Sequence, residues 1–279
     1  MRLVRYEHGG QAAVGVRIDG EVIATGYDDL IELIRDGEEG LERARAAVRD
    51  RGRAVQPERL LAPLHPGKML FCGVNFPDHA EENPNAVMPH EPFFFAKLSN
   101  AIVGPDEAIA IPTPETQSDY EVELAFVVAK RARRVPRAEA LARVFGYTIV
   151  NDISARDVQF TDNQITLGKN PDTFCPLGPE VVTADELPDP SALHLSSYVN
   201  GEQRQAAATS SWLFDVPALI EFLTRTITLE PGDLVTTGTP AGVAAFRDPP
   251  PWLRPGDEVT VEVEEIGPLT NPVVAGWEP

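Results

Sequence analysis

The chain has 279 residues, 43% of them hydrophobic, enough to fill a core larger than one small domain needs. It has 24 Lys and Arg residues against 43 Asp and Glu residues, and the resulting formal charge of −19 opposes binding to nucleic acid or to an anionic membrane surface. Two cysteines are too few for a disulfide framework and no stretch approaches the roughly 20 apolar residues that cross a bilayer, which predicts a cytoplasmic protein without a membrane partner.

The first part of the chain reads as a small α/β unit. Apolar and polar residues alternate in three short runs, which predicts strands over residues 3–6, 14–18 and 22–24. Helical periodicity follows from Leu30 through Val48. Two prolines and a glycine between Pro63 and Gly67 then precede an apolar run, as a linker entering a new core strand does. We predict a small N-terminal domain over residues 1–65 and a second domain over residues 66–279.

The second part is dominated by short β-type runs separated by proline and glycine. Strands are predicted over residues 93–95, 121–128, 146–150, 180–182, 234–237 and 259–263. Helices are predicted only around residues 138–145 and 216–226. The fold class expected from this pattern is α+β and mainly β.

Three acidic residues mark the ends of two predicted strands. Glu121 and Glu123 are two apart on a strand, so their side chains share a face, which is either an exposed strand face or a carboxylate cluster in a cavity. Asp152 follows the apolar run 146–150. If the three converge, each like-charge pair costs about 4 kcal/mol at about 4 Å and an effective dielectric near 20, so convergence implies a cation. Oxygen-only ligands favour Mg²⁺ or Mn²⁺ over zinc.

Two cationic residues downstream of Asp152 are candidates for binding an anionic substrate. Arg156 and Gln159 lie four and seven residues after Asp152, a spacing that would place all three on one face of a helical turn. Arg156 could grip a carboxylate through two hydrogen bonds, or form a surface salt bridge. Lys169 stands in a segment that reads as a loop, where a solvated lysine is the alternative.

Two further segments have the residue types of a catalytic site. His79 and Glu82 are three apart, so a short helix would place them side by side, with the carboxylate orienting the imidazole as a general base; an exposed histidine is the alternative. The glycine-rich segment 236–242, which includes Gly238 and Thr239, follows an apolar run and can present N–H groups to an oxyanion, or be a plain turn.

The order and spacing of these segments resemble the fumarylacetoacetate hydrolase family over about residues 66–275. The matching blocks are GVNF at 73–76, His79 with Glu82, DYEVEL at 119–124, GYT at 146–148, ND at 151–152, ARDVQ at 155–159, Lys169, DTF at 172–174, PLGP at 176–179, NGE at 200–202, LEPGD at 229–233 and TGTPAGV at 237–243. So many blocks in one order make the resemblance specific.

The resemblance implies a mixed β-roll catalytic domain, usually a homodimer, that binds Mg²⁺ or Mn²⁺. It implies metal ligation by Glu121, Glu123 and Asp152 and an acid/base dyad of His79 and Glu82 on a mobile lid. Lys169 is expected to assist catalysis. The residues expected to line the substrate pocket are Arg156, Gln159, Thr239, Gly238 and Phe76, the last standing where the family commonly has an aromatic hydroxyl.

The reaction expected from the resemblance is Mg²⁺-dependent hydrolysis of a C–C bond in a small 2,4-dioxo acid of the acylpyruvate or fumarylpyruvate type, through an enolate held on the metal. The same site is compatible with an oxaloacetate-type decarboxylase or with an isomerase, either keto–enol or acting on 2-hydroxyhepta-2,4-diene-1,7-dioate. A catalytically silent metal-binding relative is the alternative outside enzymes.

Overall fold

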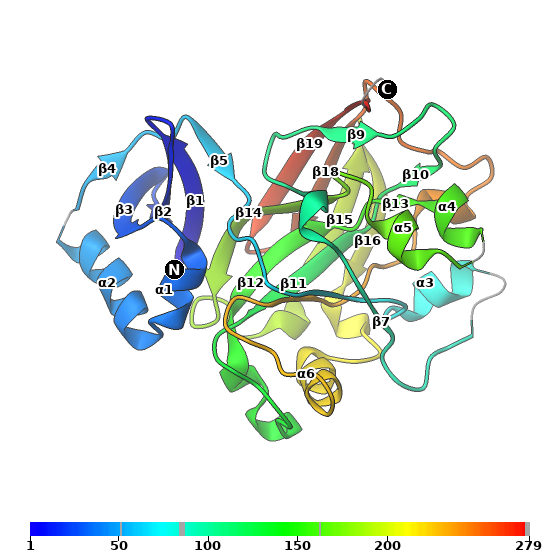
Figure 1. Cartoon of the computed structure of the whole chain (residues 1–279). Helices are drawn as coiled ribbons and strands as arrows, with labels where there is room; N and C mark the ends of the chain where they lie inside the picture. Colours follow the sequence, from blue (N-terminus) through cyan, green and yellow to red (C-terminus); the bar gives the residue numbers. More distant parts are fainter. Residues whose placement is uncertain (51, 84–86, 162, 277–279) are drawn as a thin grey trace.

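The computed structural model describes residues 1–50, 52–83, 87–161 and 163–276, which form a smaller N-terminal part and a larger part beside it (Figure 1). The helices are α1 Leu30–Arg35, α2 Glu38–Arg49, α3 Pro77–Glu82, α4 Arg156–Phe160, α5 Ile165–Lys169 and α6 Val216–Thr224. The strands are β1 Arg2–His8, β2 Gln11–Ile18, β3 Glu21–Tyr27, β4 Ala54–Val55, β5 Arg59–Leu61, β6 Met69–Cys72, β7 Phe94–Ala96, β8 Ile102–Val103, β9 Ile109–Ile111, β10 Ser118–Asp119, β11 Val122–Val128, β12 Val144–Asn151, β13 Ser154–Ala155, β14 Cys175–Thr183, β15 His194–Val199, β16 Glu202–Ala208, β17 Leu234–Thr236, β18 Glu258–Val263 and β19 Gly267–Ala275.

The predicted α+β, mainly β architecture is confirmed. One large sheet runs in the order β4-β3-β2-β1-β14-β12-β11-β17-β6-β7, and a five-stranded sheet runs β16-β15-β18-β19-β9. Most neighbours are antiparallel, but β17 pairs with β6, β14 with β8 and β19 with β9 in parallel, so the sheets are mixed. The N-terminal strands and the strands around residues 69–72, 122–128, 144–151, 234–236 and 258–263 lie where the sequence predicted them.

Two helix predictions differ from the structure. Residues 138–145 were expected to be helical, but they form two 3₁₀ turns, Arg137–Glu139 and Leu141–Arg143, and enter β12 at Val144. The β-branched and aromatic residues of β12 pair on both sides, with β11 and β14, and this pairing outweighs the weak local helical pattern. The helix expected over residues 30–48 is divided at Gly37, whose φ of 60° ends the first helical segment.

The smaller part continues the sheet of the larger part. β1 pairs antiparallel with β14, with Arg2 opposite Val182 and Leu3 opposite Val181. One hydrophobic cluster contains Leu3 from β1 together with Ala125 from β11. The division at residue 65 stays a prediction, and the structure joins the two sides of it through one sheet and one core.

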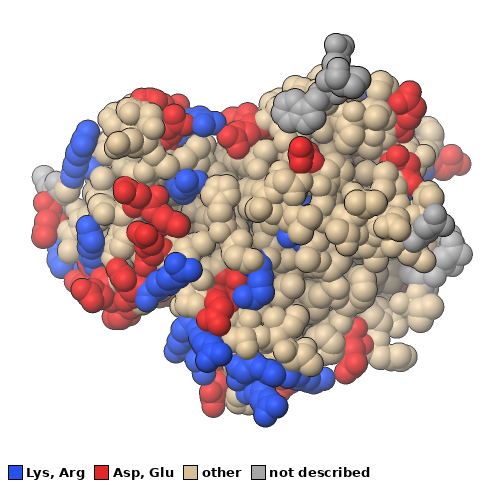
Figure 2. All heavy atoms as spheres, viewed as in Figure 1, with Lys and Arg blue, Asp and Glu red and all other residues tan. Residues whose placement is uncertain are grey.

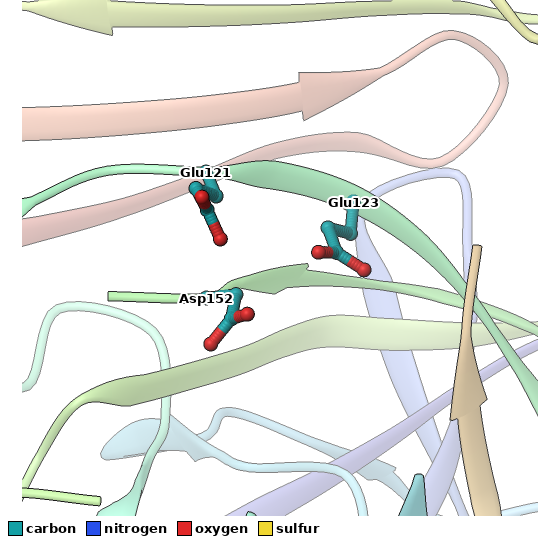
Figure 3. A group of neighbouring side chains, drawn as sticks. All are labelled: Glu121, Glu123 and Asp152. Carbon is teal, nitrogen blue, oxygen red and sulfur yellow. The ribbon is translucent and has the colours of Figure 1, made fainter. Parts of the chain in front are cut away.

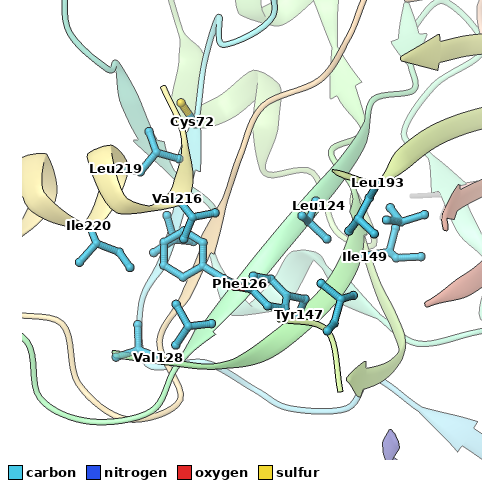
Figure 4. Close-up of a cluster of buried hydrophobic side chains, with 14 of the residues drawn as sticks. Cys72, Leu124, Phe126, Val128, Tyr147, Ile149, Leu193, Val216, Leu219 and Ile220 are labelled. Carbon is cyan, nitrogen blue, oxygen red and sulfur yellow. The ribbon is translucent and has the colours of Figure 1, made fainter. Parts of the chain in front are cut away.

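β11 lies at the centre of the core and fixes the position of the predicted acids. Val122, Leu124 and Phe126 point into a cluster that α6 covers, where Val216, Leu219 and Ile220 lie beside Phe126 and Tyr147 (Figure 4). Burial of a side chain of this size contributes about 1.5–3 kcal/mol, so the pleat of β11 is held firmly. Glu121 and Glu123 therefore project from the opposite face of a rigid strand.

Charged side chains are unevenly distributed over the face in Figure 2. Acidic and basic side chains alternate closely over the N-terminal part, whereas the larger part presents mostly uncharged atoms on this side. Within the described residues, no helix is both long enough and apolar enough to span a membrane.

Candidate active site

Glu121, Glu123 and Asp152 form one buried carboxylate cluster. Glu121 directly precedes β11, Glu123 lies within it, and Asp152 directly follows β12, its backbone N–H donating to the Glu121 carbonyl at 2.9 Å. Their exposed fractions are 3%, 1% and 0%, and one ligand atom from each lies within 4.8 Å of the others. Figure 3 shows both glutamates on the side of the strand that faces Asp152. Of the two sequence interpretations, the structure has the cluster and not an exposed strand face.

Buried cations offset part of this negative charge. Lys169 Nζ lies 2.6 Å from both Glu121 Oε2 and Asp152 Oδ2. Lys97 Nζ, fully buried behind the cluster, lies 2.5 Å from Asp152 Oδ1 and donates to the Ile153 carbonyl at 2.9 Å. Burial opposes ionisation of Glu121, but Arg156 and Lys169 outweigh it and hold the pKa of Glu121 below its usual range.

Glu123 has the least compensation of the three. Burial and the charges of Asp152 and Glu121 raise the pKa of Glu123 well above its usual value. In the described part of the chain no Lys or Arg forms an ion pair with it; its Oε2 accepts a backbone hydrogen bond from Gly238 N at 3.0 Å, and its carboxylate also accepts one from the Thr236 side chain. A divalent cation would relieve this repulsion, and three carboxylates are the hard oxygen donors that Mg²⁺ and Mn²⁺ prefer. The residues present fit such an ion.

Arg156 reaches the cluster by a different route from the one predicted. The two-residue strands β10 and β13 pair, with Asp119 opposite Ser154, and α4 begins only at Arg156. Asp152 therefore lies before the helix, and the predicted shared helical face is wrong. Arg156 nevertheless contacts the cluster because its guanidinium donates to Glu121, to Asp119 at 2.9 Å and to Gln159 at 2.9 Å. Burial opposes its charge, but Glu121 and Asp119 raise the pKa of Arg156 further.

Lys169 is the last residue of helix α5 and not a loop residue. α5 packs closely on α4 because residue 168 is glycine, where an added Cβ would lie 2.6 Å from the Cβ of Gln159. The close approach lets both Lys169 and Gln159 line one cavity. Burial opposes the lysine charge, yet Asp152 and Glu121 raise the pKa of Lys169, so it is an ammonium in the folded protein.

The dyad predicted at residues 79 and 82 has the expected local geometry. α3 begins at Pro77, which supplies a fixed φ for the first turn, and His79 Nδ1 lies 2.6 Å from Glu82 Oε1. The second oxygen of Glu82 accepts a hydrogen bond from Gly242 N at 2.8 Å. The ring of Phe246 lies 6.1 Å from the His79 ring. Both members are therefore held by contacts outside α3.

A cavity of about 160 Å³ brings most of the predicted residues together. It is lined by Cys72, Gly73, Val74, His79, Asn83, Phe93, Phe95, Glu121, Glu123, Arg156, Gln159, Phe160, Ile165, Lys169, Thr239 and Phe246. Asp152 and Glu82 contact lining residues without lining the cavity themselves. A larger cavity of about 720 Å³ lies at β2 and α2 and contains none of the predicted site residues.

Of three further residues predicted to bind substrate, one lines the cavity and two do not. Thr239 lines the cavity, with its Oγ accepting from Gln205 Nε2 at 2.8 Å. Gly238 is not a lining residue, and its N–H is directed at Glu123. Phe76 is fully buried outside the lining and packs edge-on against Trp212, with ring centroids 6.5 Å apart. Its role in substrate binding has no geometric support here.

Sequence reasoning missed Lys97 and Asp119. Asp119 continues the two-residue spacing of Glu121 and Glu123, so the alternation could have indicated it. Lys97 follows the aromatic run of β7, where one lysine after a strand gave no sign that it is fully buried against Asp152.

Comparison with known proteins agrees with this arrangement. Residues 68–274 match the family model described as fumarylacetoacetate (FAA) hydrolase C-terminal. The chain is 39% identical over 289 residues to a Xenopus laevis protein named oxaloacetate tautomerase fahd2, mitochondrial, covering 98% of this chain and 90% of that one.

Two solved structures are similar over nearly the whole chain. A fumarylacetoacetate hydrolase from psychrophilic Exiguobacterium antarcticum has a TM-score of 0.88 at 38% identity, covering 99% of each chain. A maleylpyruvate hydrolase from Sphingobium sp. SYK-6, in complex with manganese(II) and pyruvate, has a TM-score of 0.83 at 32% identity, covering 99% of this chain and 100% of that one. The match over residues 68–274, together with these relatives, shows that the chain belongs to the fumarylacetoacetate hydrolase family and is an enzyme.

Proposed function

We propose that the enzyme interconverts the keto and enol forms of a small 2-oxo acid, with oxaloacetate as the first substrate to test. The observation that carries this proposal is that His79, paired with Glu82, lines the same 160 Å³ cavity as Glu121, Arg156 and Lys169. A base and fixed positive charge in one small cavity suit proton transfer next to a carbonyl group. The name of the Xenopus laevis relative supplies the substrate.

Glu121, Glu123 and Asp152 would hold Mg²⁺ or Mn²⁺, which when bound would act as a Lewis acid toward the 2-oxo group. Manganese is the ion named in the Sphingobium structure. Arg156, oriented by Asp119 and Gln159, would bind the substrate carboxylate. Lys169 would stabilise negative charge that develops on the 2-oxo oxygen.

His79 would move the proton. Its Nδ1 faces Glu82, so in the neutral ring Nδ1 carries the hydrogen and Nε2 is the free base. Nε2 takes a proton from C3 of the keto form as the C–H electrons become the C2–C3 double bond, and the same proton is returned to the 2-oxo oxygen to give the enol. A positioned base of this kind contributes about 10²–10⁴ in rate.

Hydrolysis of a short 2,4-dioxo acid, the reaction predicted first from sequence, is the second candidate. The His79–Glu82 pair favours it because the same base can take a proton from water, which then adds to the distal carbonyl. The Sphingobium relative named maleylpyruvate hydrolase supports this reading. The homodimer and the cytoplasmic location stay predictions, and the Xenopus laevis relative carries mitochondrial in its name.

One set of assays separates these reactions. Enol-oxaloacetate, oxaloacetate and acetylpyruvate are incubated with the Mn²⁺-loaded enzyme, and enol absorbance and pyruvate are measured, with Glu123→Gln as the matched control. The proposal predicts faster loss of the enol without pyruvate; pyruvate from acetylpyruvate indicates hydrolysis, and pyruvate from oxaloacetate indicates decarboxylation. No acceleration on any of the three, with Mn²⁺ bound, contradicts the proposal and favours a catalytically silent relative.

A further inference from the structure

Asp119 is fully buried and each of its oxygens accepts two hydrogen bonds. Oδ1 accepts from Tyr120 N at 2.9 Å and from Ala244 N at 2.6 Å. Oδ2 accepts from Arg156 Nε at 2.9 Å and from Ala245 N at 3.1 Å. Apart from the bond from the neighbouring Tyr120, these bonds come from two segments of the chain far apart in sequence, and each segment contributes a residue to the cavity lining, Arg156 from one and Phe246 from the other.

The first segment carries the guanidinium that would bind the substrate carboxylate. Arg156 uses Nε for Asp119, one terminal nitrogen for Gln159 and the other for Glu121. Asp119 lies beside the guanidinium edge that the other two do not contact. Because a planar guanidinium is held on three sides, its orientation toward the cavity is fixed before substrate binds.

The second segment, residues 242–247, supports the acid/base dyad, and we call it the dyad seat. Gly242 N donates to Glu82, and Phe246 packs beside the His79 ring. The Gly242 carbonyl accepts from Tyr120 Oη at 3.3 Å and from Arg247 Nε at 3.1 Å. Gly242 has a φ of 109°, and a Cβ there would lie 2.2 Å from the Arg204 carbonyl oxygen. Only glycine therefore fits at this position, and the backbone of the dyad seat is held close to Arg204.

We infer that Asp119 is a positioning residue that holds the dyad seat and Arg156 in fixed positions relative to each other. The base His79 and the carboxylate-binding Arg156 are then both aligned by one carboxylate. The kcat measurement that tests this inference rests on the proposed function, whereas the structural argument rests on the four hydrogen bonds of Asp119. An asparagine has similar size but one acceptor oxygen, so its NH₂ would face N–H donors from Arg156 or the seat. An N–H of Arg156 or of the dyad seat that is left buried without an acceptor would move away from residue 119. The dyad seat and Arg156 would then no longer be aligned with each other.

The first test is Asp119→Asn, measured by oxaloacetate tautomerisation and by oxalate binding to the Mn²⁺-loaded enzyme. We expect kcat to fall by about 10–100-fold and oxalate affinity by about tenfold, with Mn²⁺ affinity changed by less than about threefold. In a His79→Ala background the kcat effect of Asp119→Asn should nearly vanish, because the dyad is already lost, while the loss of oxalate affinity persists. Asp233→Asn is the matched control: Asp233 is a buried carboxylate accepting from Glu230 N at 2.7 Å, away from the cavity, and its loss should leave kcat unchanged.

Ala244→Pro tests the seat alone. Ala244 is the first residue of a 3₁₀ turn and Val243 before it is extended (φ −62°, ψ 158°), so proline fits the backbone while removing the N–H that bonds to Asp119. We expect kcat to fall about tenfold while oxalate affinity is kept, since Arg156 retains its contact. Oxalate binding is measured without turnover, so it reports on Asp119 and Arg156 even if the enzyme proves not to be a tautomerase. Unchanged kcat and unchanged oxalate affinity in Asp119→Asn would overturn the inference. So would a double variant in which Asp119→Asn lowers kcat by the same factor with His79→Ala as it does in the wild type.

Discussion

At the scale of single residues, the site is arranged around charge that burial makes costly. Glu121 and Asp152 each have a lysine within 2.6 Å, whereas Glu123 has only the neutral donors Gly238 N and the Thr236 side chain. The carboxylates therefore differ in their need for a cation, although all three are buried. The least compensated one, Glu123, should control how metal binding depends on pH.

Metal uptake should release a proton from Glu123. Burial and the charges of Asp152 and Glu121 raise the pKa of Glu123 in the metal-free protein, and only the ionised carboxylate is a ligand. Affinity for Mn²⁺ should therefore fall as pH is lowered through this raised pKa and level off above it. Calorimetry in two buffers of different ionisation enthalpy measures the released proton. Glu123→Gln should bind weakly without proton release, and a pH-independent affinity in the wild type would contradict the assignment.

His79→Ala should lower turnover by about 10²–10⁴ while leaving Mn²⁺ affinity nearly unchanged, because the imidazole supplies a proton acceptor and no metal ligand. Steady-state kinetics and calorimetry on the same preparation measure both. His90→Ala removes an exposed histidine from the same part of the chain and should behave as the wild type. If turnover survives in His79→Ala, the base is another group.

Period-two spacing was enough to place Glu121 and Glu123 on one face, and the apolar run before Asp152 placed it at a strand end. The spacing could not say that both faces of β11 are buried, which depends on α6 on one side and on β1 and β14 contributing to the cluster on the other. Lys97 stayed unassigned for the same reason, because its partner Asp152 lies 55 residues away. The alternation extends to Asp119, but its bond to Ala244, 125 residues away, could not be read from the spacing.

At the scale of elements, the site is built from pieces too short for sequence patterns to indicate. α4 and α5 have five residues each and β10 and β13 have two each. Nucleating so short a helix is unfavourable in isolation, so packing against neighbours decides its existence. Lys169 was accordingly expected in a loop, and Asp152 was expected to share one face of a helical turn with Arg156 and Gln159.

Gly168→Ala tests the contact between α4 and α5. Alanine normally stabilises a helix relative to glycine by about 0.5–1 kcal/mol, but here the methyl group would press on Gln159. We expect instead a loss of about 1–3 kcal/mol in the free energy of unfolding and a higher KM, because Gln159 no longer orients Arg156. Urea unfolding and kinetics measure these. Leu167→Ala, an exposed position on α5, should change stability by less than about 0.5 kcal/mol; an equal effect at both positions would argue against the packing explanation.

At the scale of the whole molecule, the N-terminal part and the catalytic part share a sheet edge and a core. The sequence predicted a boundary near residue 65 from its prolines and glycine, and the strand before it, β5, ends at Leu61. Local composition could not show that β1 returns to pair with β14, since that pairing joins residues about 180 apart. The predicted homodimer would likewise depend on a surface that the sequence does not localise.

Residues 66–279 expressed alone should be less stable than the full chain. Removing β1 exposes the edge of β14 and removes Leu3 and Leu30 from the shared cluster. We expect aggregation or a lower midpoint in urea, and a single unfolding transition for the full chain by both fluorescence and near-ultraviolet circular dichroism. A truncated chain with the full midpoint and full Mn²⁺ affinity would show that the two parts are energetically independent.

The central claim is that Glu121, Glu123 and Asp152 hold one divalent cation beside the His79–Glu82 dyad. Anomalous diffraction from crystals grown with Mn²⁺ tests it most directly. The account predicts one strong anomalous peak per chain within bonding distance of an oxygen from each of the three carboxylates, lost in crystals of Glu123→Gln. No peak at this cluster, or a peak bound by other residues, would contradict it.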